Sequence, residues 1–338
     1  MVAAKCLKSP LPVLACLVVF VYVAVVYNWI FACRILPSVG KALLMTPFII
    51  IFNALWLLSI VSYLRTHLSD PGRIPETWDA FVRSSGLTPS STRSGWQPGR
   101  AQTCKKCDGR VRPERAHHCS ICKVCVLRMD HHCPWTGNCV GFKNYKFFLL
   151  LGVYACLSSC FALLSALPEL LYCATGWHPS DASDDADGAG WRYSSSTFEG
   201  GLFLGFGVAS LAVFAALCMM LSVHLPLACH NLTAIEELYD NMENPYDQRD
   251  WVKNLSQIMG APGVDWLLPV APRRPLGDGN SFARRGEELP VGLAFTAEPP
   301  SSDSEEDSEA LEAPLEDLWS LRYGVSQAER DKPTPATT

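Results

Sequence analysis

The chain has 338 residues, of which 49% are hydrophobic and only 18% are charged. Soluble domains usually carry about 25% charged residues, so this composition argues against an ordinary soluble protein. Secreted disulfide scaffolds are short chains, so the fifteen cysteines of this long chain do not indicate one. The net charge of −5 indicates no partner by itself.

Four uncharged apolar runs are long enough to cross a hydrocarbon core of about 30 Å as helices. They are residues 11–31, 42–64, 147–167 and 201–223. A cleaved signal peptide is the alternative for the first run. Its apolar stretch is too long for that, and no small-residue cleavage site precedes Arg34.

The loops between these runs differ in charge, which predicts the orientation of the chain. Fourteen Lys and Arg lie from Arg65 to Lys146, whereas the first short loop has only Arg34 and Lys41. Loops rich in Lys and Arg stay in the cytoplasm. We therefore expect the long middle loop and both termini on the cytoplasmic side.

These features predict five regions. They are helices one and two (1–68), a cytoplasmic loop (69–146) with a cysteine-rich domain (104–148), helices three and four with an acidic lumenal loop (147–223), a C-terminal cytoplasmic segment (224–268) and a disordered tail (269–338). Pro, Gly, Ser and acidic residues dominate the tail. Within the tail, Leu315, Leu318, Trp319 and Leu321 can form one face of a short partner-binding helix. We predict a polar connector over 65–103, and no internal repeat stands out.

The middle loop contains a dense cluster of potential metal ligands. Seven cysteines and four histidines lie between Cys104 and Cys139, with Cys-x-x-Cys spacing three times. Zn²⁺ prefers four such sulfur and nitrogen ligands in a tetrahedron, and it would supply folding free energy to a loop with little core. Disulfides are the alternative, but a cytoplasmic location disfavours them. Spacing alone does not decide which ligands share a site.

The sequence Asp130-His131-His132-Cys133-Pro134 is the candidate reactive centre. Pro134 favours an extended backbone at Cys133, so His131 and Cys133 can share one face while His132 serves a metal. A neutral His131 can take the proton of Cys133, and Asp130 can hold the imidazole if the chain bends there. The alternative for Cys133 is a further zinc ligand. Two tetrahedral sites need eight ligands, however, and six other cysteines with two histidines suffice.

These residues resemble a known family. The segment from Cys104 to Phe148 resembles the cysteine-rich domain of the DHHC protein S-acyltransferases, or palmitoyltransferases, and the match is especially close from His131 onward. Three flanking motifs agree: Asp70-Pro71-Gly72, Thr233-Ala234-Ile235-Glu236, and the aromatic/Asn element from Asn244 to Gly260. Ala234 stands where the family has a second Thr, which would lower the rate if that hydroxyl orients Asp130.

The resemblance implies two structural Zn²⁺ ions, held by interleaved ligands. One set is Cys104, Cys107, His118 and Cys125, and the other is Cys119, Cys122, His132 and Cys139. It implies a catalytic triad of Asp130, His131 and Cys133. Arg112, Arg115 and His117 could meet the phosphates of acyl-CoA, the co-substrate; the alternative is that they are solvated charges.

The expected fold is thus an all-α polytopic membrane protein, with four transmembrane helices and a small zinc-bound cysteine-rich cytoplasmic domain between the second and third. We expect a long-chain acyl group, such as palmitate, to pass from acyl-CoA to cytoplasmic cysteines of membrane-associated proteins. The resemblance favours an endomembrane, the Golgi before the ER or plasma membrane. A zinc-bound adaptor leaves Cys133 without a role. A metal transporter needs ionisable groups within the spans. A nucleic-acid partner does not suit a loop tethered to the bilayer at both ends.

Overall fold

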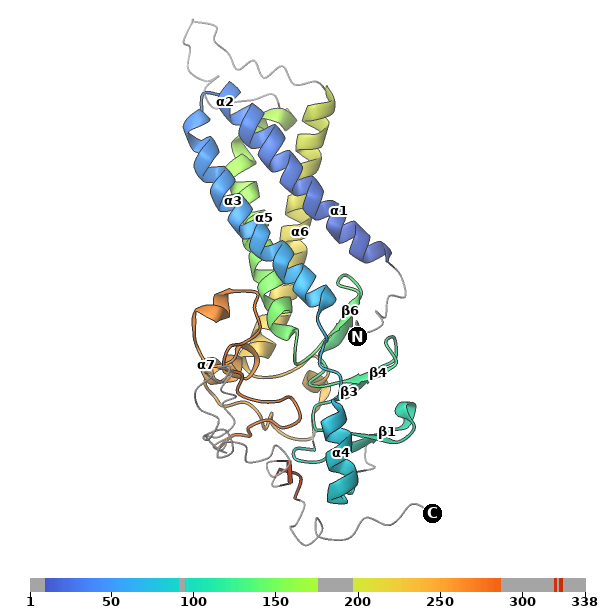
Figure 1. Ribbon diagram of the computed structural model, residues 1–338. Helices are drawn as coiled ribbons and strands as arrows, with labels where there is room; N and C mark the ends of the chain where they lie inside the picture. Colours follow the sequence, from blue (N-terminus) through green and yellow to red (C-terminus); the bar gives the residue numbers. More distant parts are fainter. Residues whose placement is uncertain are drawn as a thin grey trace, which may run out of the picture. The chain divides into compact units, whose positions relative to one another are not determined.

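The computed structural model describes residues 10–90, 95, 97–175, 197–286, 319–320 and 322–324 (Figure 1). The chain divides into two compact units. A helical unit contains residues 9–64 and 148–223, and a second unit, called here the cysteine-rich unit, contains residues 65–147 and the chain from His224 onward.

Within the described residues, four helices have the length and apolar composition to cross a membrane. These candidate spans are Leu11–Ser38, Ala42–Leu68, Tyr145–Thr175 and Phe198–Cys229. The first combines α1 (Leu11–Val25), a π-helical stretch (Val26–Ile35) and the short α2 (Leu36–Ser38); the others are α3 (Ala42–Leu68), α5 (Tyr145–Thr175) and α6 (Thr197–Cys229). The predicted four helices, with a cysteine-rich segment between the second and third, are confirmed. The acidic loop predicted between α5 and α6 lies outside the described residues.

Aromatic side chains form the centre of the helical unit. The Tyr27 ring stacks on Phe52 with 3.9 Å between centroids, and Phe31 stacks on Phe203 at 5.9 Å. Two glycines of α6 allow close helix contact: a Cβ on Gly205 would lie 2.7 Å from the Tyr22 hydroxyl, and one on Gly207 would lie 2.9 Å from Leu170. Small residues of this kind let transmembrane helices approach each other.

The cysteine-rich unit contains three consecutive two-stranded antiparallel hairpins, which the all-α expectation did not include. They are β1 (Gln102–Cys104) with β2 (Arg110–Arg112), β3 (His117–Cys119) with β4 (Val124–Val126), and β5 (His131–Cys133) with β6 (Asn138–Val140). The strands have three residues each, too short for an alternating pattern to reveal them.

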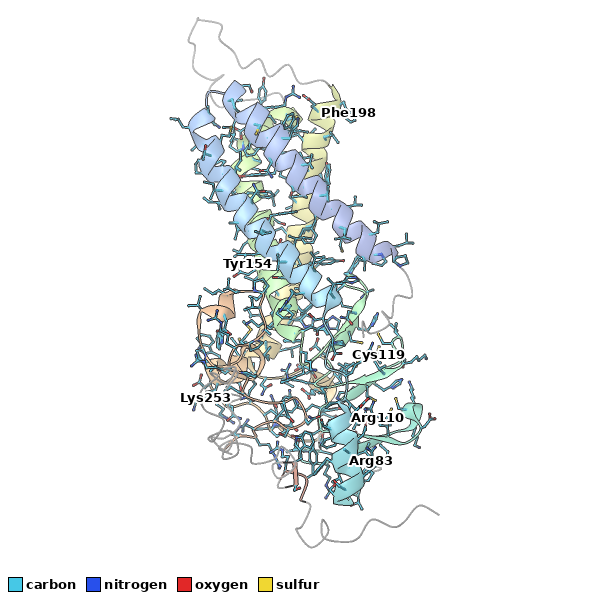
Figure 2. All side chains as sticks on the ribbon, viewed as in Figure 1. Arg83, Arg110, Cys119, Tyr154, Phe198 and Lys253 are labelled. Atoms are coloured by element: carbon cyan, nitrogen blue, oxygen red, sulfur yellow. The ribbon has the colours of Figure 1, made fainter. Side chains whose placement is uncertain are left out.

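A short helix, α4 (Glu76–Ser85), lies in the stretch that was predicted to be a polar connector. Its Trp78 and Phe81 are buried in a cluster with Cys104, Cys125 and Leu127 of the hairpins. The helix ends at Gly86, whose φ of 63° is a left-handed conformation that glycine adopts easily. Asp79 pairs with Arg110 of β2, labelled in Figure 2, at 2.6 Å.

The C-terminal part of this unit consists of short helices and loops. It includes turns of 3₁₀ helix at Glu236–Leu238 and Val264–Leu267, and α7 (Trp251–Met259), which Asp250 caps by accepting the N–H of Val252 at 2.9 Å. Disorder was predicted from residue 269, but residues 269–286 are described, and Phe282 is buried against Tyr246 and Phe142. The composition of this stretch is mostly polar, but the few apolar residues within it, such as Phe282, pack against the rest of the unit. Most of the remaining tail lies outside the described residues.

Candidate active site

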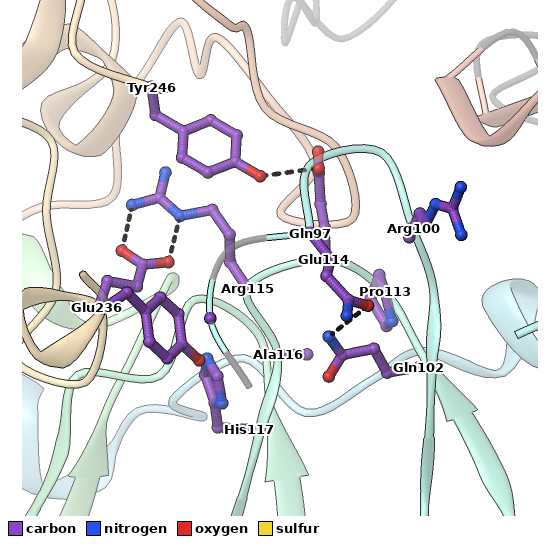
Figure 3. Close-up of a pocket in the computed structure, with 12 residues that line it drawn as sticks. Gln97, Arg100, Gln102, Pro113, Glu114, Arg115, Ala116, His117, Glu236 and Tyr246 are labelled. Carbon is purple, nitrogen blue, oxygen red and sulfur yellow. Dashed lines mark hydrogen bonds and ion pairs between the residues drawn. The ribbon is translucent and has the colours of Figure 1, made fainter. Parts of the chain in front are cut away.

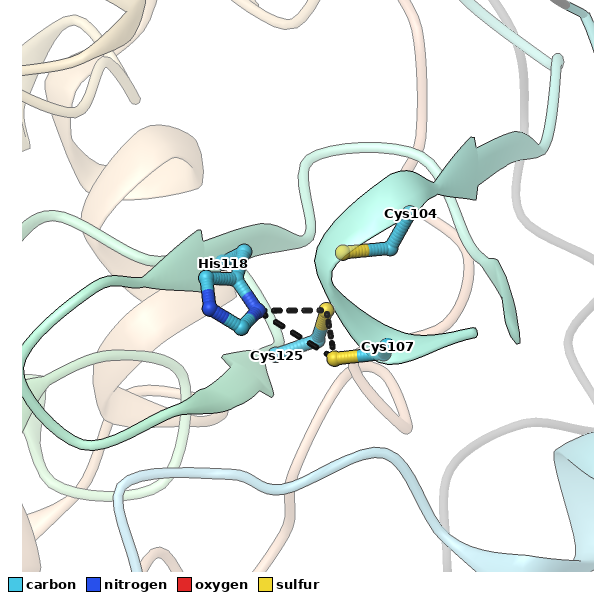
Figure 4. Close-up of side chains that lie close together, drawn as sticks. All are labelled: Cys104, Cys107, His118 and Cys125. Atoms are coloured by element: carbon cyan, nitrogen blue, oxygen red, sulfur yellow. Dashed lines mark hydrogen bonds between the residues drawn. The ribbon is translucent and has the colours of Figure 1, made fainter. Parts of the chain in front are cut away.

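The first cluster of Cys and His side chains unites two hairpins. Cys104 and Cys107 lie at the tip of the first hairpin, while His118 and Cys125 face each other across the second. Nδ1 of His118 lies 3.2 Å from Sγ of Cys107 and 3.8 Å from Sγ of Cys125 (Figure 4). The two cysteine sulfurs are 3.8 Å apart.

The second cluster repeats this arrangement one hairpin further along. Cys119 and Cys122 lie at the tip of the second hairpin, and His132 and Cys139 face each other across the third. Nδ1 of His132 lies 3.8, 3.4 and 3.7 Å from the sulfurs of Cys119, Cys122 and Cys139.

Both clusters have the geometry of a tetrahedral zinc site. Zn–S bonds of about 2.3 Å and Zn–N bonds of about 2.1 Å place neighbouring ligand atoms about 3.6–3.8 Å apart. Four of the six distances above match this spacing, while the His118–Cys107 and His132–Cys122 distances of 3.2 and 3.4 Å are shorter. In each cluster all four ligand atoms lie within 4.8 Å of one another. The grouping is the one that the resemblance implied, and the donor set is compatible with zinc.

The hairpins also contain an internal repeat that the sequence analysis missed. Residues 117–126 read HHCSICKVCV, and residues 131–140 read HHCPWTGNCV. Cys133 therefore occupies the tip position that Cys119 has in the hairpin before, and Thr136 stands in place of Cys122. In the described part of the chain no further hairpin supplies a His/Cys pair after Cys133, which belongs to neither four-ligand cluster.

Cys133 is buried, which raises the pKa of its thiol, but interactions with His131 and with Thr136, including the Thr136 backbone N–H, outweigh that effect and lower the pKa. The Thr136 hydroxyl donates to the carbonyl oxygen of Cys133 at 3.4 Å. In the preceding hairpin, the N–H of Cys122, the residue that corresponds to Thr136, donates to Sγ of Cys119 at 3.3 Å. The third hairpin thus has the same kind of turn as the second. Its Cys133, however, interacts with His131 and lies outside the Cys/His clusters.

Asp130 holds the other side of the His131 ring. Its Oδ2 lies 2.6 Å from Nδ1 of His131, and its Oδ1 accepts the backbone N–H of Ala234 at 2.9 Å. Burial opposes ionisation of this carboxyl, but His131 and the Ala234 N–H keep its pKa below the usual value. Burial also lowers the pKa of His131, yet Asp130 and Cys133 raise it overall to about 9. The structure therefore brings the predicted Asp130, His131 and Cys133 into one hydrogen-bonded chain.

His224 is a further residue near this chain that the sequence analysis did not identify. Its Nδ1 lies 3.5 Å from Oδ2 of Asp130, and its ring centroid is 5.2 Å from that of His131. The fourth apolar run was taken to end at residue 223, one position before it. A histidine in the last turns of a membrane span is unusual, and that was the available signal.

Arg115, which was predicted to meet a CoA phosphate, has several protein partners in the structure. Its guanidinium is fully buried, makes two hydrogen bonds to Glu236 at 2.7 and 2.8 Å, and lies 4.3 Å from the Tyr246 ring centroid (Figure 3). Asn231 accepts further hydrogen bonds at 3.2 and 2.7 Å. These partners satisfy the hydrogen-bonding groups of the guanidinium. The ion pair of Arg115 and Glu236 is called the buried clasp below.

The other two predicted phosphate ligands differ from each other. Burial lowers the pKa of His117 to about 4, so this imidazole is neutral at physiological pH and offers no positive charge to a phosphate. The side chain of Arg112 is half-buried, and its Nη2 donates to Gln102 at 2.8 Å. Of the three, Arg112 alone keeps an accessible charge.

The motif at Asp70-Pro71-Gly72 forms a turn at the end of α3. Oδ1 of Asp70 accepts the N–H groups of Gly72 and Arg73 at 3.3 and 3.2 Å. The carbonyl of Gly72 then accepts the N–H of Leu127 at 2.7 Å. The turn thus fixes the chain leaving α3 against the hairpins.

Known proteins of one family are similar to this chain. A family model described as DHHC palmitoyltransferase matches residues 97–241. Palmitoyltransferase ZDHHC7 of Mus musculus is 33% identical over 223 residues, 65% of this chain and 66% of its own length. Probable protein S-acyltransferase 15 of Arabidopsis thaliana is 31% identical, covering 69% of this chain and 87% of that protein. Palmitoyltransferase ZDHHC3 of Homo sapiens is 32% identical, covering 66% and 69%.

The matched region contains both Cys/His clusters, the chain of Asp130, His131 and Cys133, and the clasp residue Glu236. The chain covers 66% of the mouse relative's length, just under two thirds. The Arabidopsis relative is covered much more fully. On this evidence, the chain belongs to the DHHC palmitoyltransferase family of protein S-acyltransferases.

Proposed function

We propose that this protein is an S-acyltransferase that moves a long-chain acyl group from acyl-CoA to cysteines of other proteins through an acyl-enzyme on Cys133. One observation carries the proposal: Cys133 lies outside both Cys/His clusters, while its neighbours His131 and Thr136 lower the pKa of its thiol. A thiolate kept from a metal and paired with an imidazolium is an activated nucleophile.

In the first step, the Cys133 thiolate attacks the thioester carbonyl of acyl-CoA. A new C–S bond forms at Cys133 and the bond to the CoA sulfur breaks. The imidazolium of His131 donates its proton to the departing CoA thiolate. Asp130, 2.6 Å from Nδ1, keeps the other imidazole nitrogen directed at Cys133.

In the second step, a substrate cysteine takes the acyl group. Neutral His131 removes the proton of the incoming thiol, and its sulfur attacks the acyl carbonyl on Cys133. The bond to Cys133 breaks and the thiolate returns, paired again with the imidazolium of His131. No group outside the two substrates is consumed, so the cycle balances.

The two Cys/His clusters would each hold one structural zinc ion, which supplies folding free energy to the hairpins. Cys104, Cys107, His118 and Cys125 would form one site, and Cys119, Cys122, His132 and Cys139 the other. Because His132 and Cys133 are adjacent on β5, the second site would fix the strand that presents the nucleophile.

The membrane placement follows from charge and from the chemistry of the acyl chain. Lys and Arg residues concentrated between Arg65 and Lys146 favour the cytoplasm for this loop and for both termini. Each buried CH₂ of an acyl chain gives about 0.8 kcal/mol, so a long-chain thioester arrives at a membrane surface. Substrates would be membrane-associated proteins with cytoplasmic cysteines, on an endomembrane such as the Golgi. Arg112 remains the candidate for a CoA phosphate.

Metabolic labelling with an alkyne fatty acid tests this function. The wild-type chain should carry a label that hydroxylamine removes, since thioesters are cleaved by hydroxylamine, and Cys133→Ser should not. A matched control is Cys156→Ser, which changes a cysteine of α5 outside the Cys/His clusters. Equal labelling of wild type and Cys133→Ser would refute the assignment of the nucleophile.

A further inference from the structure

Residues close to the C-terminus lie on the face of the cysteine-rich unit formed by α4 and the first hairpin. The Trp319 ring is 2% exposed and contacts Trp78 and Phe81 edge-on, with centroids 5.5 and 5.3 Å apart. Its indole N–H donates to Oδ2 of Asp278 at 2.7 Å. Aromatic pairs in this geometry stabilise a contact beyond the area that they bury.

Arg322 supplies a positive charge to a buried carboxylate. Glu114 is 3% exposed, and its carboxylate accepts hydrogen bonds from the Gly99 N–H at 2.6 Å, the Tyr246 hydroxyl at 2.8 Å and the Phe282 N–H at 3.1 Å. Nε of Arg322 donates to the same carboxylate at 2.9 Å. Within the described part of the chain, Glu114 forms no other ion pair, and a buried charge without its partner is costly.

Tyr323 completes the contact. Its ring lies edge-on to Trp78 with 5.0 Å between centroids. Its hydroxyl donates to the carbonyl of Asn280 and accepts the N–H of Glu114 at 3.0 Å. Each of three side chains, those of Trp319, Arg322 and Tyr323, therefore has its own specific partners. Their spacing in the sequence is Trp-x-x-Arg-Tyr.

We propose that the surface formed by Trp78, Phe81 and Glu114, called here the tail seat, is a peptide-binding site whose ligand is the chain's own Trp319–Tyr323 segment. The occupant is an aromatic-rich peptide with one arginine. The seat recognises its two end rings through Trp78 and its charge through Glu114. Of the residues in the predicted partner-binding face, Trp319 is described and packs within the chain itself, while Leu315, Leu318 and Leu321 lie outside the described residues.

The tail seat is connected to the active site by consecutive contacts. Glu114 accepts the Tyr246 hydroxyl, and the Tyr246 ring covers the guanidinium of Arg115. Arg115 pairs with Glu236, whose Oε2 accepts the N–H of Thr233 at 3.0 Å. The next N–H, that of Ala234, holds Asp130. We expect the seated tail to support this arrangement, an effect on the reaction that rests on the proposed function.

A direct test measures peptide binding to a vacated seat. The full-length double variant Trp319→Ala/Arg322→Ala should release the tail. It should then bind a fluorescein-labelled peptide of residues 315–326, measured by fluorescence anisotropy up to about 1 mM, the effective concentration of a tethered segment. The wild-type chain, with its seat filled, should bind at least about tenfold more weakly. Adding Glu114→Gln to the double variant should abolish binding.

The matched control is Arg249→Ala/Trp251→Ala, which removes the same two residue types where the side chains are exposed. This variant should behave like the wild type. Equal binding by wild type and the vacated variant, no binding to either, or equal binding of a peptide carrying the two alanines would each overturn the proposal.

The rate of acylation at Cys133 provides a second readout. The vacated variant should form the acyl-enzyme about two- to thirtyfold more slowly, and the peptide should restore the rate. An unchanged rate would refute the connection to Asp130 while leaving the binding site intact. If no variant is acylated, wild type included, the proposed function fails but the binding result still stands.

Discussion

The backbone N–H of Ala234 donates a hydrogen bond of 2.9 Å to Oδ1 of Asp130. The family motif that residues 233–236 resemble has a threonine at position 234. From the sequence we expected a lower rate of acyl transfer if that threonine hydroxyl orients Asp130. In this chain the main chain itself holds Asp130. A residue without a side-chain donor is therefore compatible with an ordered Asp130, His131 and Cys133.

Substitutions at position 234 should separate the main-chain contact from the side chain. Ala234→Thr should change the rate of acyl-enzyme formation by less than about threefold, because the N–H remains. Ala234→Pro removes the donor, and losing a hydrogen bond to a charged group costs about 1.5–3 kcal/mol, so the rate should fall about ten- to hundredfold. Rapid-quench acylation assays measure both rates. A large gain from threonine would show that the hydroxyl matters after all.

The buried clasp should be important for stability. Glu236→Gln would leave the Arg115 charge buried without its counterion, which costs about 3–5 kcal/mol. Both side chains are only 1% exposed, so water cannot compensate for the loss. The free energy of unfolding in detergent, measured by urea titration, should fall by this amount.

An exposed pair in the same unit is the matched control for the clasp. Arg249 and Glu243 lie 3.5 Å apart, with side chains 69% and 77% exposed. Glu243→Gln should leave the unfolding midpoint unchanged, because solvent screens this pair. If both Glu→Gln variants shift the midpoint equally, the clasp has no special role.

Loss of zinc ligands should have a different signature from loss of the nucleophile. Two Cys/His clusters predict two zinc ions per chain, measured by mass spectrometry with inductively coupled plasma. Cys119→Ser and Cys104→Ser should each retain about one ion and unfold at lower temperature, since zinc supplies folding free energy. Cys133→Ser should retain both ions. Loss of zinc from Cys133→Ser would place this sulfur among the ligands.

The pH dependence of alkylation should reveal the thiolate of Cys133. Burial raises its pKa, but His131 and Thr136 lower it below the ordinary value of 9.0, while the pKa of His131 rises to about 9. The ion pair is therefore present between these two pKa values and is lost as pH falls through the lower one. Iodoacetamide should modify the Cys133 peptide at a pH below the ordinary cysteine pKa of 9.0. His131→Ala should move the Cys133 profile upward, and an unmoved profile would contradict the pairing.

Parts of the site that depend on local residue types were predictable from sequence. Cys-x-x-Cys spacing indicated metal sites, and Pro134 indicated the extended backbone found in β5. The repeat of His-His-Cys at residues 117–119 and 131–133 was also readable and would have identified Cys133 as a tip cysteine without a second cluster. The repeat is hard to see because Thr136 stands where the preceding hairpin has Cys122.

Other features depend on contacts between distant parts of the chain. Arg115 looked like a phosphate ligand because sequence does not show that Glu236, 121 positions away, would neutralise it. The tail from residue 269 looked disordered by composition. A few apolar and aromatic residues within it, such as Phe282 and Trp319, are nevertheless buried. They pack against residues that lie far away in the sequence.

Site-mapped mass spectrometry of purified protein incubated with palmitoyl-CoA should locate the acyl group. We expect a single hydroxylamine-sensitive palmitoyl group on the peptide that contains Cys133, formed in the wild type and absent from His131→Ala at the same zinc content. An acyl group on another cysteine, with Cys133 unmodified, would show that Cys133 is not the nucleophile.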